Sequence, residues 1–331
     1  MLILGTKCGT IKYISYSIMQ RGMKMKILTL TLNPAFDIHC GVEKFLPERE
    51  NYMRSYRRHI GGKGVNISRA LHENGVESTA FVVLGRQNCA DFERELSSCG
   101  IKYVPFYVDG RIRENITIHP ENAPETRISF QGCAVSRAAA EEIFEMILPL
   151  CDKNTIFTFN GRMPAGLSVA DIAPLLERVK ASGAYLAVDS GTFTMEDFAS
   201  VKPWFIKPNQ EEISRLVGRE INTPAQALSA AREIRARGIE NVMVSMGGKG
   251  AVLASDEGDF TVSVPNIDVI STIGAGDSSV AGFCAAFAEV KSTLECLMNA
   301  VSYGSAACLT AGTNPPKRED VETIRSMIQR V

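Results

Sequence analysis

Short apolar runs rich in β-branched and aromatic residues alternate along this chain with segments of helical periodicity. This alternation limits the possible folds more than any other feature. Strands separated by helices join as right-handed βαβ units, so we expect an α/β fold on a doubly wound, mainly parallel sheet. The predicted strands are residues 26–31, 79–84, 101–108, 155–159, 184–189, 204–207 and 241–246.

Two of the intervening helices carry readable end signals. Ser168 with Asp171 three residues later is typical of a helix start, and Gly183 is typical of the end of that helix. Thr223-Pro224 predicts a second start, with Gly238 ending the helix before the next strand.

Two stretches interrupt the alternation. Residues 37–60 and 109–132 contain short strand-like pieces and no helical period. We expect them to form a small β-sheet lid over the crevice at the carboxyl ends of the main strands, with ordinary surface excursions as the alternative. The α/β core then comprises residues 25–36, 61–108 and 133–331.

The first 24 residues fit poorly with the rest of the chain. They are too polar for a membrane span and lack an apolar stretch with a small-residue cleavage site. Met23 and Met25 directly precede the first predicted strand. We therefore expect residues 1–24 to be an N-terminal extension outside the fold, with the native start at Met23 or Met25.

Charge and cysteine usage exclude several classes of protein. With 36 Lys and Arg against 37 Asp and Glu, the net charge of −1 provides no general attraction to nucleic acid or to a membrane. The 9 cysteines form no Cys-x-x-Cys pair, and the 4 histidines are scattered without metal-ligand spacing. A disulfide scaffold and a zinc site are both disfavoured, and a cytoplasmic protein with reduced thiols is expected.

The strongest glycine cluster lies at residues 271–279 and opens an apolar helix. Gly274 and Gly276 allow successive backbone N–H groups to point at one anion, and the helix N-terminus adds positive potential. Asp277 then lies in the first turn, where a carboxylate is well placed as a general base beside a phosphoryl group. The alternative is an acidic residue that only complements the helix dipole.

A second cluster, residues 61–66, also leads into a helix, which we expect to run from Ile67 to His72. Gly62 lies in the tight turn, Lys63 offers a positive charge, and Asn66 offers both a donor and an acceptor to a hydroxyl. The spacing differs from that of a P-loop. A plain loop is the alternative.

Two further segments follow predicted strands. Residues 245–250 either cradle nucleotide phosphates or turn a hairpin into residues 250–254. Asn209 and Glu212, which follow Lys207, are three residues apart and share one helix face. They suit a water-mediated Mg²⁺ site or, alternatively, are solvated residues at a helix start.

Together these segments resemble the ribokinase-like, phosphofructokinase B type carbohydrate kinases. The likeness runs from Ile27 to about Thr313, and its elements occur in the family's order. They are Thr31–Asp37, Gly61–Asn66, Val188–Gly191, Lys207–Glu212, Ser245–Gly250, Thr272–Asp277 and Gly304–Ala307.

The resemblance implies ATP-dependent phosphorylation of a sugar hydroxyl. Asp277 would be the catalytic base, and Gly274, Ala275 and Gly276 would form the anion hole for the transferred phosphoryl group. Asn209 and Glu212 match the family's Asn-x-x-Glu motif, which is linked to Mg²⁺. The nucleotide side would include Lys207, Asn209, Ser245, Gly247, Gly250 and Ala307.

The same resemblance implies the sugar side. Asp37, Gly62 and Asn66 would hold hydroxyls, and Lys63 would reach a sugar phosphate. Arg113 matches a lid arginine that contacts the substrate phosphate, with Arg127 a weaker second candidate. In relatives the lid often pairs between two subunits, so a homodimer through the lid is expected. The partners are then a phosphosugar and ATP, with neither nucleic acid nor a membrane.

Within the family, the opening segment and residues 61–66 look most like 1-phosphofructokinases and tagatose-6-phosphate kinases. The leading reaction is phosphorylation of D-fructose 1-phosphate to fructose 1,6-bisphosphate, with tagatose 6-phosphate, fructose 6-phosphate or another sugar as alternatives. Two positions depart from the pattern. Arg162 replaces a sugar-facing serine, and Tyr52 stands where many 1-phosphofructokinases have arginine. Arg162 either grips the substrate or turns to solvent.

Three rival functions are less well supported. A nucleoside or ribose kinase needs no anion ligands such as Lys63 and Arg113. A catalytically silent sugar-phosphate sensor would not need Asp277 between its glycines. A Rossmann oxidoreductase would carry a glycine loop after the first strand, where this chain has Asn33-Pro34.

Overall fold

The computed structural model describes residues 25–331. The predicted N-terminal extension, residues 1–24, lies outside the described residues. The main sheet confirms all seven predicted strands and adds a hairpin at one edge. Its order is β13 (Gly258–Val262), β12 (Ala251–Ser255), β11 (Asn241–Ser245), β10 (Phe205–Ile206), β9 (Tyr185–Asp189), β8 (Thr155–Asn160), β1 (Lys26–Thr31), β4 (Thr79–Gly85) and β5 (Lys102–Val108).

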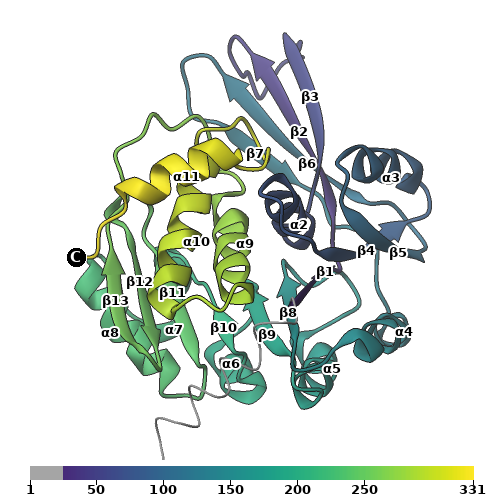
Figure 1. Ribbon diagram of the computed structural model, residues 1–331. Coiled ribbons are helices and arrows are strands. Elements are labelled where there is room, and N and C mark those ends of the chain that lie inside the picture. Colours follow the sequence, from purple (N-terminus) through teal and green to yellow (C-terminus); the bar gives the residue numbers. More distant parts are fainter. Residues whose placement is uncertain (1–24) are drawn as a thin grey trace, which may run out of the picture.

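Within this sheet the neighbouring strands from β11 across to β5 pair in parallel, whereas β12 and β13 are antiparallel to their neighbours. Helices cover both faces, which confirms the doubly wound α/β fold. One face of the sheet packs on α4 (Arg137–Ile147), α5 (Val169–Ala181), α6 (Met195–Val201), α7 (Gln210–Val217) and α8 (Pro224–Arg235). The other packs on α2 (Lys63–Glu73), α3 (Cys89–Ser98), α9 (Ala275–Ala288), α10 (Thr293–Ala307) and α11 (Arg318–Met327), several of which stand in front of the sheet in Figure 1.

Alternation along the strands explains both layers. In β1, Leu28 and Leu30 belong to the core beneath α4–α8, whereas Ile27 belongs to the core beneath α9 and α10. A strand that is apolar at both sets of positions must be covered on both faces. The continuous apolar runs in the sequence therefore mark the buried parallel sheet.

The predicted helix ends are present at α5 and α8. Asp171 Oδ2 accepts a hydrogen bond from Ser168 N at 2.9 Å, and Gly183 has a φ of +90° beyond the last turn of α5. Thr223 caps α8, with Pro224 as its first residue. The predicted start of α2 at Ile67 is wrong by one turn, because the helix begins at Lys63. Its first turn holds a single apolar residue, Val65, and so carries no apolar period to reveal it.

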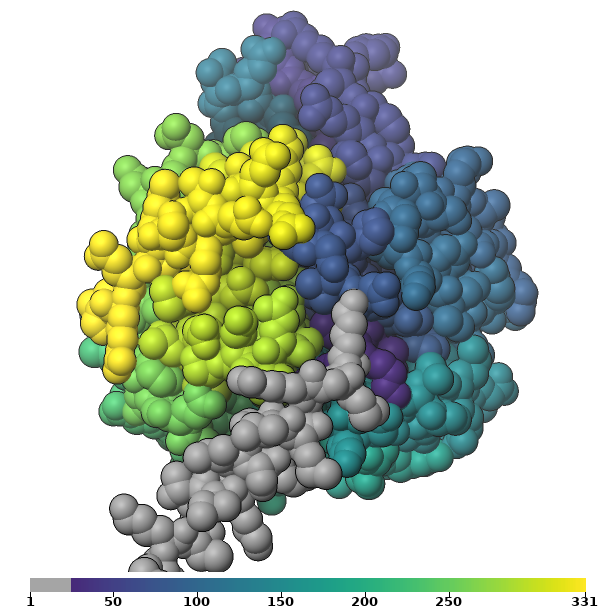
Figure 2. Space-filling view, in the orientation of Figure 1, coloured from purple at the N-terminus to yellow at the C-terminus, as the bar shows by residue number. Residues whose placement is uncertain are grey.

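The residues of the predicted β-layer form a second, four-stranded sheet. Its order is β3 (Ser55–Gly61), β2 (Ala35–Val42), β6 (Arg113–Pro120) and β7 (Thr126–Ser129). This small sheet projects from one side of the molecule, at the top of Figures 1 and 2. Asp37 pairs with His59 on one side and Asn115 on the other, so all three share one face. Among the described residues, no helix has the length and apolar character that a bilayer crossing requires.

Candidate active site

The N-terminus of α9 is the centre of the site. Gly274 caps the helix with a φ of +81°, a left-handed conformation that suits glycine. At Gly276 a Cβ atom would lie 3.2 Å from Lys207 Nζ, so glycine lets this buried ammonium approach the helix. The two glycines thus bring backbone N–H groups, the positive end of the helix dipole and a lysine together at the N-terminus of α9. A phosphoryl group binds favourably at such a position.

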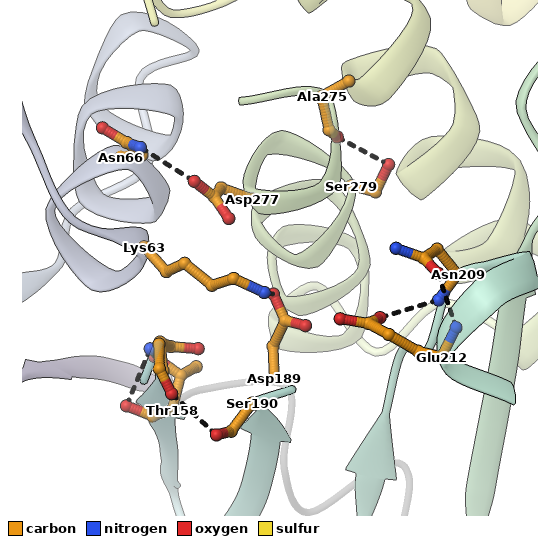
Figure 3. A network of polar contacts seen from close by, with 12 residues as sticks. Lys63, Asn66, Thr158, Asp189, Ser190, Asn209, Glu212, Ala275, Asp277 and Ser279 are labelled. Atoms are coloured by element: carbon orange, nitrogen blue, oxygen red, sulfur yellow. Dashed lines mark hydrogen bonds and ion pairs between the residues drawn. The ribbon is translucent and has the colours of Figure 1, made fainter. Parts of the chain in front are cut away.

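Asp277 lies in the first turn of α9 and is only 8% exposed. Asn66 Nδ2 donates a hydrogen bond to its Oδ2 at 2.8 Å, as Figure 3 shows. Burial raises the pKa of Asp277 to about 6. The ammonium of Lys63 acts in the opposite direction, and the nearby carboxylate of Asp189 adds to the rise. A carboxylate with such a pKa can exchange a proton near neutrality.

Lys63 comes from the first turn of α2 and points between Asp277 and Asp189 (Figure 3). Its Nζ lies 3.0 Å from Asp189 Oδ2, and Asp189 is buried at the carboxyl end of β9. Burial opposes the charge of Lys63, but the carboxylates of Asp189 and Asp277 outweigh it, so the pKa of the lysine is raised. The structure thus places Lys63 beside the predicted base.

Asn209 and Glu212 begin α7 as a reciprocal cap. Glu212 N donates to Asn209 Oδ1 at 2.8 Å, and Asn209 N donates to Glu212 Oε2 at 2.9 Å. The second carboxylate oxygen, Oε1, faces Gly191, where an added Cβ would lie 3.2 Å away. Within residues 25–331 no group of three or more His, Cys, Asp or Glu could hold a metal ion. A cation bound here would depend on water and phosphate for most of its ligands.

Three arginines are close enough for their positive charges to interact. They are Arg113 of β6, Arg127 of β7 and the exposed Arg162 of the loop after β8. Burial lowers the pKa of Arg113, and the positive charges of Arg162 and Arg127 lower it further. Arg113 Nε is buried without a hydrogen-bond partner, although one terminal nitrogen donates to Asn33 O at 3.3 Å. Clustered cations with an unsatisfied donor are suited to an anion.

Asp37 faces the same region from β2 and is buried. Its Oδ1 accepts a hydrogen bond from Asn115 Nδ2 at 2.8 Å and lies 4.0 Å from a terminal nitrogen of Arg127. Gly61 lies against its Oδ2, and Gly62 has a φ of +124°. The amide oxygens of Asn66 and Asn115 are buried without partners. A polyol can satisfy such atoms with its hydroxyl groups.

A cavity of about 400 Å³ lies on the other side of the α9 N-terminus. Ser245, Gly247 and Gly250 line one side, and Gly304 and Ser305 of α10 line another. The antiparallel pairing of β11 and β12 confirms the hairpin reading of residues 245–250, so this turn is both a hairpin and a cavity wall. Ala307 is buried near the end of α10, outside the lining residues, and Lys207 lies at the α9 N-terminus.

Sequence reasoning missed two groupings. Asp189 stands out in the sequence only as part of a family element, and pairing it with Lys63 requires the sheet topology. Three of the histidines, which look scattered in the sequence, meet on the small sheet. His39 Nδ1 and His119 Nε2 are 2.9 Å apart, and His59 joins them in a cavity of about 560 Å³. The period-2 alternation of Asp37 and His39 was the available signal.

Comparisons with known proteins agree with this geometry. Residues 32–320 match the pfkB family carbohydrate kinases. A 1-phosphofructokinase of Vibrio cholerae is 29% identical over 307 residues, covering 93% of this chain and 97% of that protein. A tagatose-6-phosphate kinase of Staphylococcus epidermidis is 29% identical over 306 residues, covering 92% and 98%. The crystal structure of phosphofructokinase-2 from Escherichia coli with substrates and products superposes with a TM-score of 0.84 at 28% identity, covering 91% and 99%.

Proposed function

Because this chain belongs to the pfkB family of carbohydrate kinases, and is thus an ATP-dependent carbohydrate kinase, we propose that its acceptor is a ketohexose phosphate. The leading reaction is D-fructose 1-phosphate to fructose 1,6-bisphosphate. The observation that carries the proposal is the arginine cluster: Arg113 and Arg127 of the small sheet lie near Asp37, and the charge of Arg162 acts on Arg113. A neutral sugar needs no such charge, which argues against a ribose or nucleoside kinase.

Asp277 is the proposed catalytic base. The acceptor oxygen attacks the γ-phosphorus of ATP while its proton passes to Asp277. The bond from phosphorus to the β–γ bridging oxygen breaks, and ADP leaves with that electron pair. The amide of Asn66 orients the carboxylate. Gly274, Ala275 and Gly276 supply N–H groups to the transferred phosphoryl group, and Lys207 lies close enough to Gly276 to add a positive charge.

The sugar and its phosphate divide between two sets of residues. Asp37, Gly62 and Asn66 hold hydroxyl groups, with Asn115 as a further ligand that the sequence did not identify. Arg113 and Arg162 bind the phosphate already present, with Arg127 beside them. Lys63 is too fully engaged by Asp189 to serve as the main phosphate ligand.

ATP occupies the cavity beside the β11–β12 hairpin. Ser245, Gly247 and Gly250 approach its phosphates, and Gly304 and Ser305 of α10 lie beside the adenine base, with Ala307 buried behind them. Mg²⁺, which the family implies, fits the oxygen-only chemistry of Asn209 and Glu212 through water, because Glu212 Oε1 is not used by the helix cap. When bound, the ion neutralises phosphate charge.

The small sheet is proposed to act as a lid and as the interface of a homodimer. Its outer face, opposite to Asp37, carries the large exposed side chains of Tyr56 and Ile128, at 61% and 44% exposure. Tyr52, Met53 and Phe130 nearby in the chain are also exposed. Exposed apolar side chains gathered on one sheet favour burial against a second copy.

A coupled ADP-release assay tests the function. Fructose 1-phosphate, tagatose 6-phosphate, fructose 6-phosphate and fructose are compared at equal concentration. We expect turnover with a phosphosugar and little with fructose. Preference for tagatose 6-phosphate would select the second candidate reaction. Binding of a phosphosugar without any ADP release would identify a silent sensor instead.

The arginine cluster is tested separately. We expect Arg162→Ala to raise KM for the phosphosugar about tenfold or more while KM for ATP stays unchanged, since a charge-assisted hydrogen bond to phosphate is lost. Arg137→Ala, which removes an exposed arginine on α4, is the matched control. An unchanged KM for the phosphosugar would place Arg162 in solvent.

A further inference from the structure

Asp189 has no role in the proposed phosphoryl transfer, although its surroundings are unusual. It is a buried carboxylate, 4% exposed, at the carboxyl end of β9. Lys63 Nζ lies 3.0 Å from its Oδ2, and Lys207 also lowers its pKa against the effect of burial. A buried ion pair is weak evidence of stabilisation, because desolvation offsets the attraction. Its position beside the base therefore invites another explanation.

The first turn of α2 contacts both carboxylates. Lys63 and Asn66 are three residues apart and so lie on one side of the helix, where Lys63 reaches Asp189 and Asn66 reaches Asp277 (Figure 3). The two carboxylates come from different elements, β9 and α9. One ammonium group thus lies between two buried negative charges.

Three charged groups have the largest effects on Asp277. Lys63 from α2 and Lys207 from the segment after β10 favour its ionised form, whereas Asp189 from β9 opposes it. Glu212 of α7 acts on Lys63. Without Lys63, two like charges would share a buried site, and one carboxyl group would keep its proton.

We propose that Lys63 is a positioning residue that holds Asp277 ionised and oriented for proton abstraction, that Asp189 keeps Lys63 in place for this purpose, and that Lys63 does not bind the sugar phosphate. The proposal rests on the proposed function, because it takes Asp277 as the base. Asp189 holds the ammonium group of Lys63 in place by an ion pair, and the positive charge of Lys63 acts on Asp277.

The two partners have opposite effects on the base, which gives a distinctive signature. Lys63→Met removes a positive charge, so the acidic limb of the pH profile of kcat should move to higher pH by about one unit. This shift corresponds to a tenfold rise in the proton affinity of Asp277. Asp189→Asn removes the opposing charge and releases Lys63 toward Asp277, so the limb should move to lower pH. The double variant loses both effects, and its limb should return toward that of the parent.

The experiment measures kcat against pH from 5 to 9 with saturating ATP and phosphosugar, for the parent and the three variants. Lys63→Arg, which keeps the charge, should keep the limb near that of the parent. The fold-change in KM for the phosphosugar should be much smaller than the tenfold change that the shift of the acidic limb represents. A purely structural role would lower kcat at every pH without moving the limb.

Two results would overturn the proposal. One is a limb that moves in the same direction in both single variants, and the other is a large rise in KM with an unmoved limb for Lys63→Met, which would return Lys63 to the phosphate. If Lys63→Met does not fold, Asp189→Asn and the charge-balanced double variant carry the test. Failure of the proposed function is separate, because it would appear as retained turnover in Asp277→Asn.

Discussion

Replacing Asp277 by asparagine should abolish turnover and at the same time stabilise the fold at neutral pH. Burial raises the pKa of this carboxyl from the ordinary value of 3.8 to about 6. A shift of about two units corresponds to ~3 kcal/mol between the protonated and ionised forms. Because the pKa is higher in the folded state, protonated Asp277 stabilises the fold, and this contribution is lost as pH rises from about 4 to about 6.

At pH 8 the parent therefore carries the full cost of a buried negative charge, and Asp277→Asn does not. Asn66 can still donate to the amide oxygen of the replacement, so the local hydrogen bond survives. We expect the variant to be more stable than the parent by up to ~3 kcal/mol at pH 8, roughly a 6 °C rise in Tm, and by almost nothing at pH 4. The gain is an upper bound because Lys63 loses one of its two carboxylate neighbours.

The assay is urea-induced unfolding at pH 4, 6 and 8, alongside ADP release at pH 8. Asp109→Asn, which neutralises an exposed aspartate in the turn after β5, is the control and should change neither measurement. A variant no more stable than the parent at pH 8 would refute the electrostatic reasoning. Measurable turnover would remove Asp277 from the role of base.

Three further outcomes are expected. Asn209→Ala and Thr223→Ala remove the side-chain caps of α7 and α8 respectively, so each should lower the free energy of unfolding by ~1 kcal/mol. Only Asn209→Ala should also reduce turnover and the dependence of turnover on Mg²⁺. Equal turnover in the two variants would mean that Asn209 is a helix cap and nothing more. Gly282→Ala should destabilise the fold by ~1–3 kcal/mol in thermal unfolding, because the added Cβ would lie 2.6 Å from Asn299 O across the α9–α10 contact. Gly248→Ala is the control, because its Cβ would meet nothing within 4 Å. Unchanged stability in Gly282→Ala would mean that the two helices separate freely. Burial, together with the charge of His119, lowers the pKa of His39, so the small sheet should lose stability as pH falls below 6.5. Amide hydrogen exchange should therefore show that β2 opens more readily at pH 5.5 than at pH 7.5. Opening that is independent of pH would contradict this sign.

Much of the fold was predictable because its signals are local. The strands of the parallel sheet are continuous apolar runs, and the ends of α5 and α8 follow from residues within one turn, such as Ser168 with Asp171. The two segments that form the small sheet were recognisable because helical periodicity stops there. The start of α2 at Lys63 was missed because its first turn holds a single apolar residue, Val65, and bonds to other elements.

The site was predictable residue by residue but not as an arrangement. Residue type and spacing alone identify three parts of the site. These are the glycines around Asp277, the pair Asn209 and Glu212, and the turn at residues 245–250. Their partners come from distant elements, as Lys63 and Asp189 show, which are 126 positions apart in the sequence. Likewise, the three histidines of the small sheet come from three separate strands.

The α/β class, the order of the elements and the chemistry that each loop can offer all follow from the amino-acid order, because backbone conformation and apolar periodicity depend on near neighbours. Which charges meet depends on how the chain packs. Tertiary packing paired Lys63 with Asp189, gathered Arg113, Arg127 and Arg162, and buried Asp277 deeply enough to raise its pKa. Coulomb energy and desolvation depend on distances in space and on burial, and neither quantity is written in the order of residues along the chain.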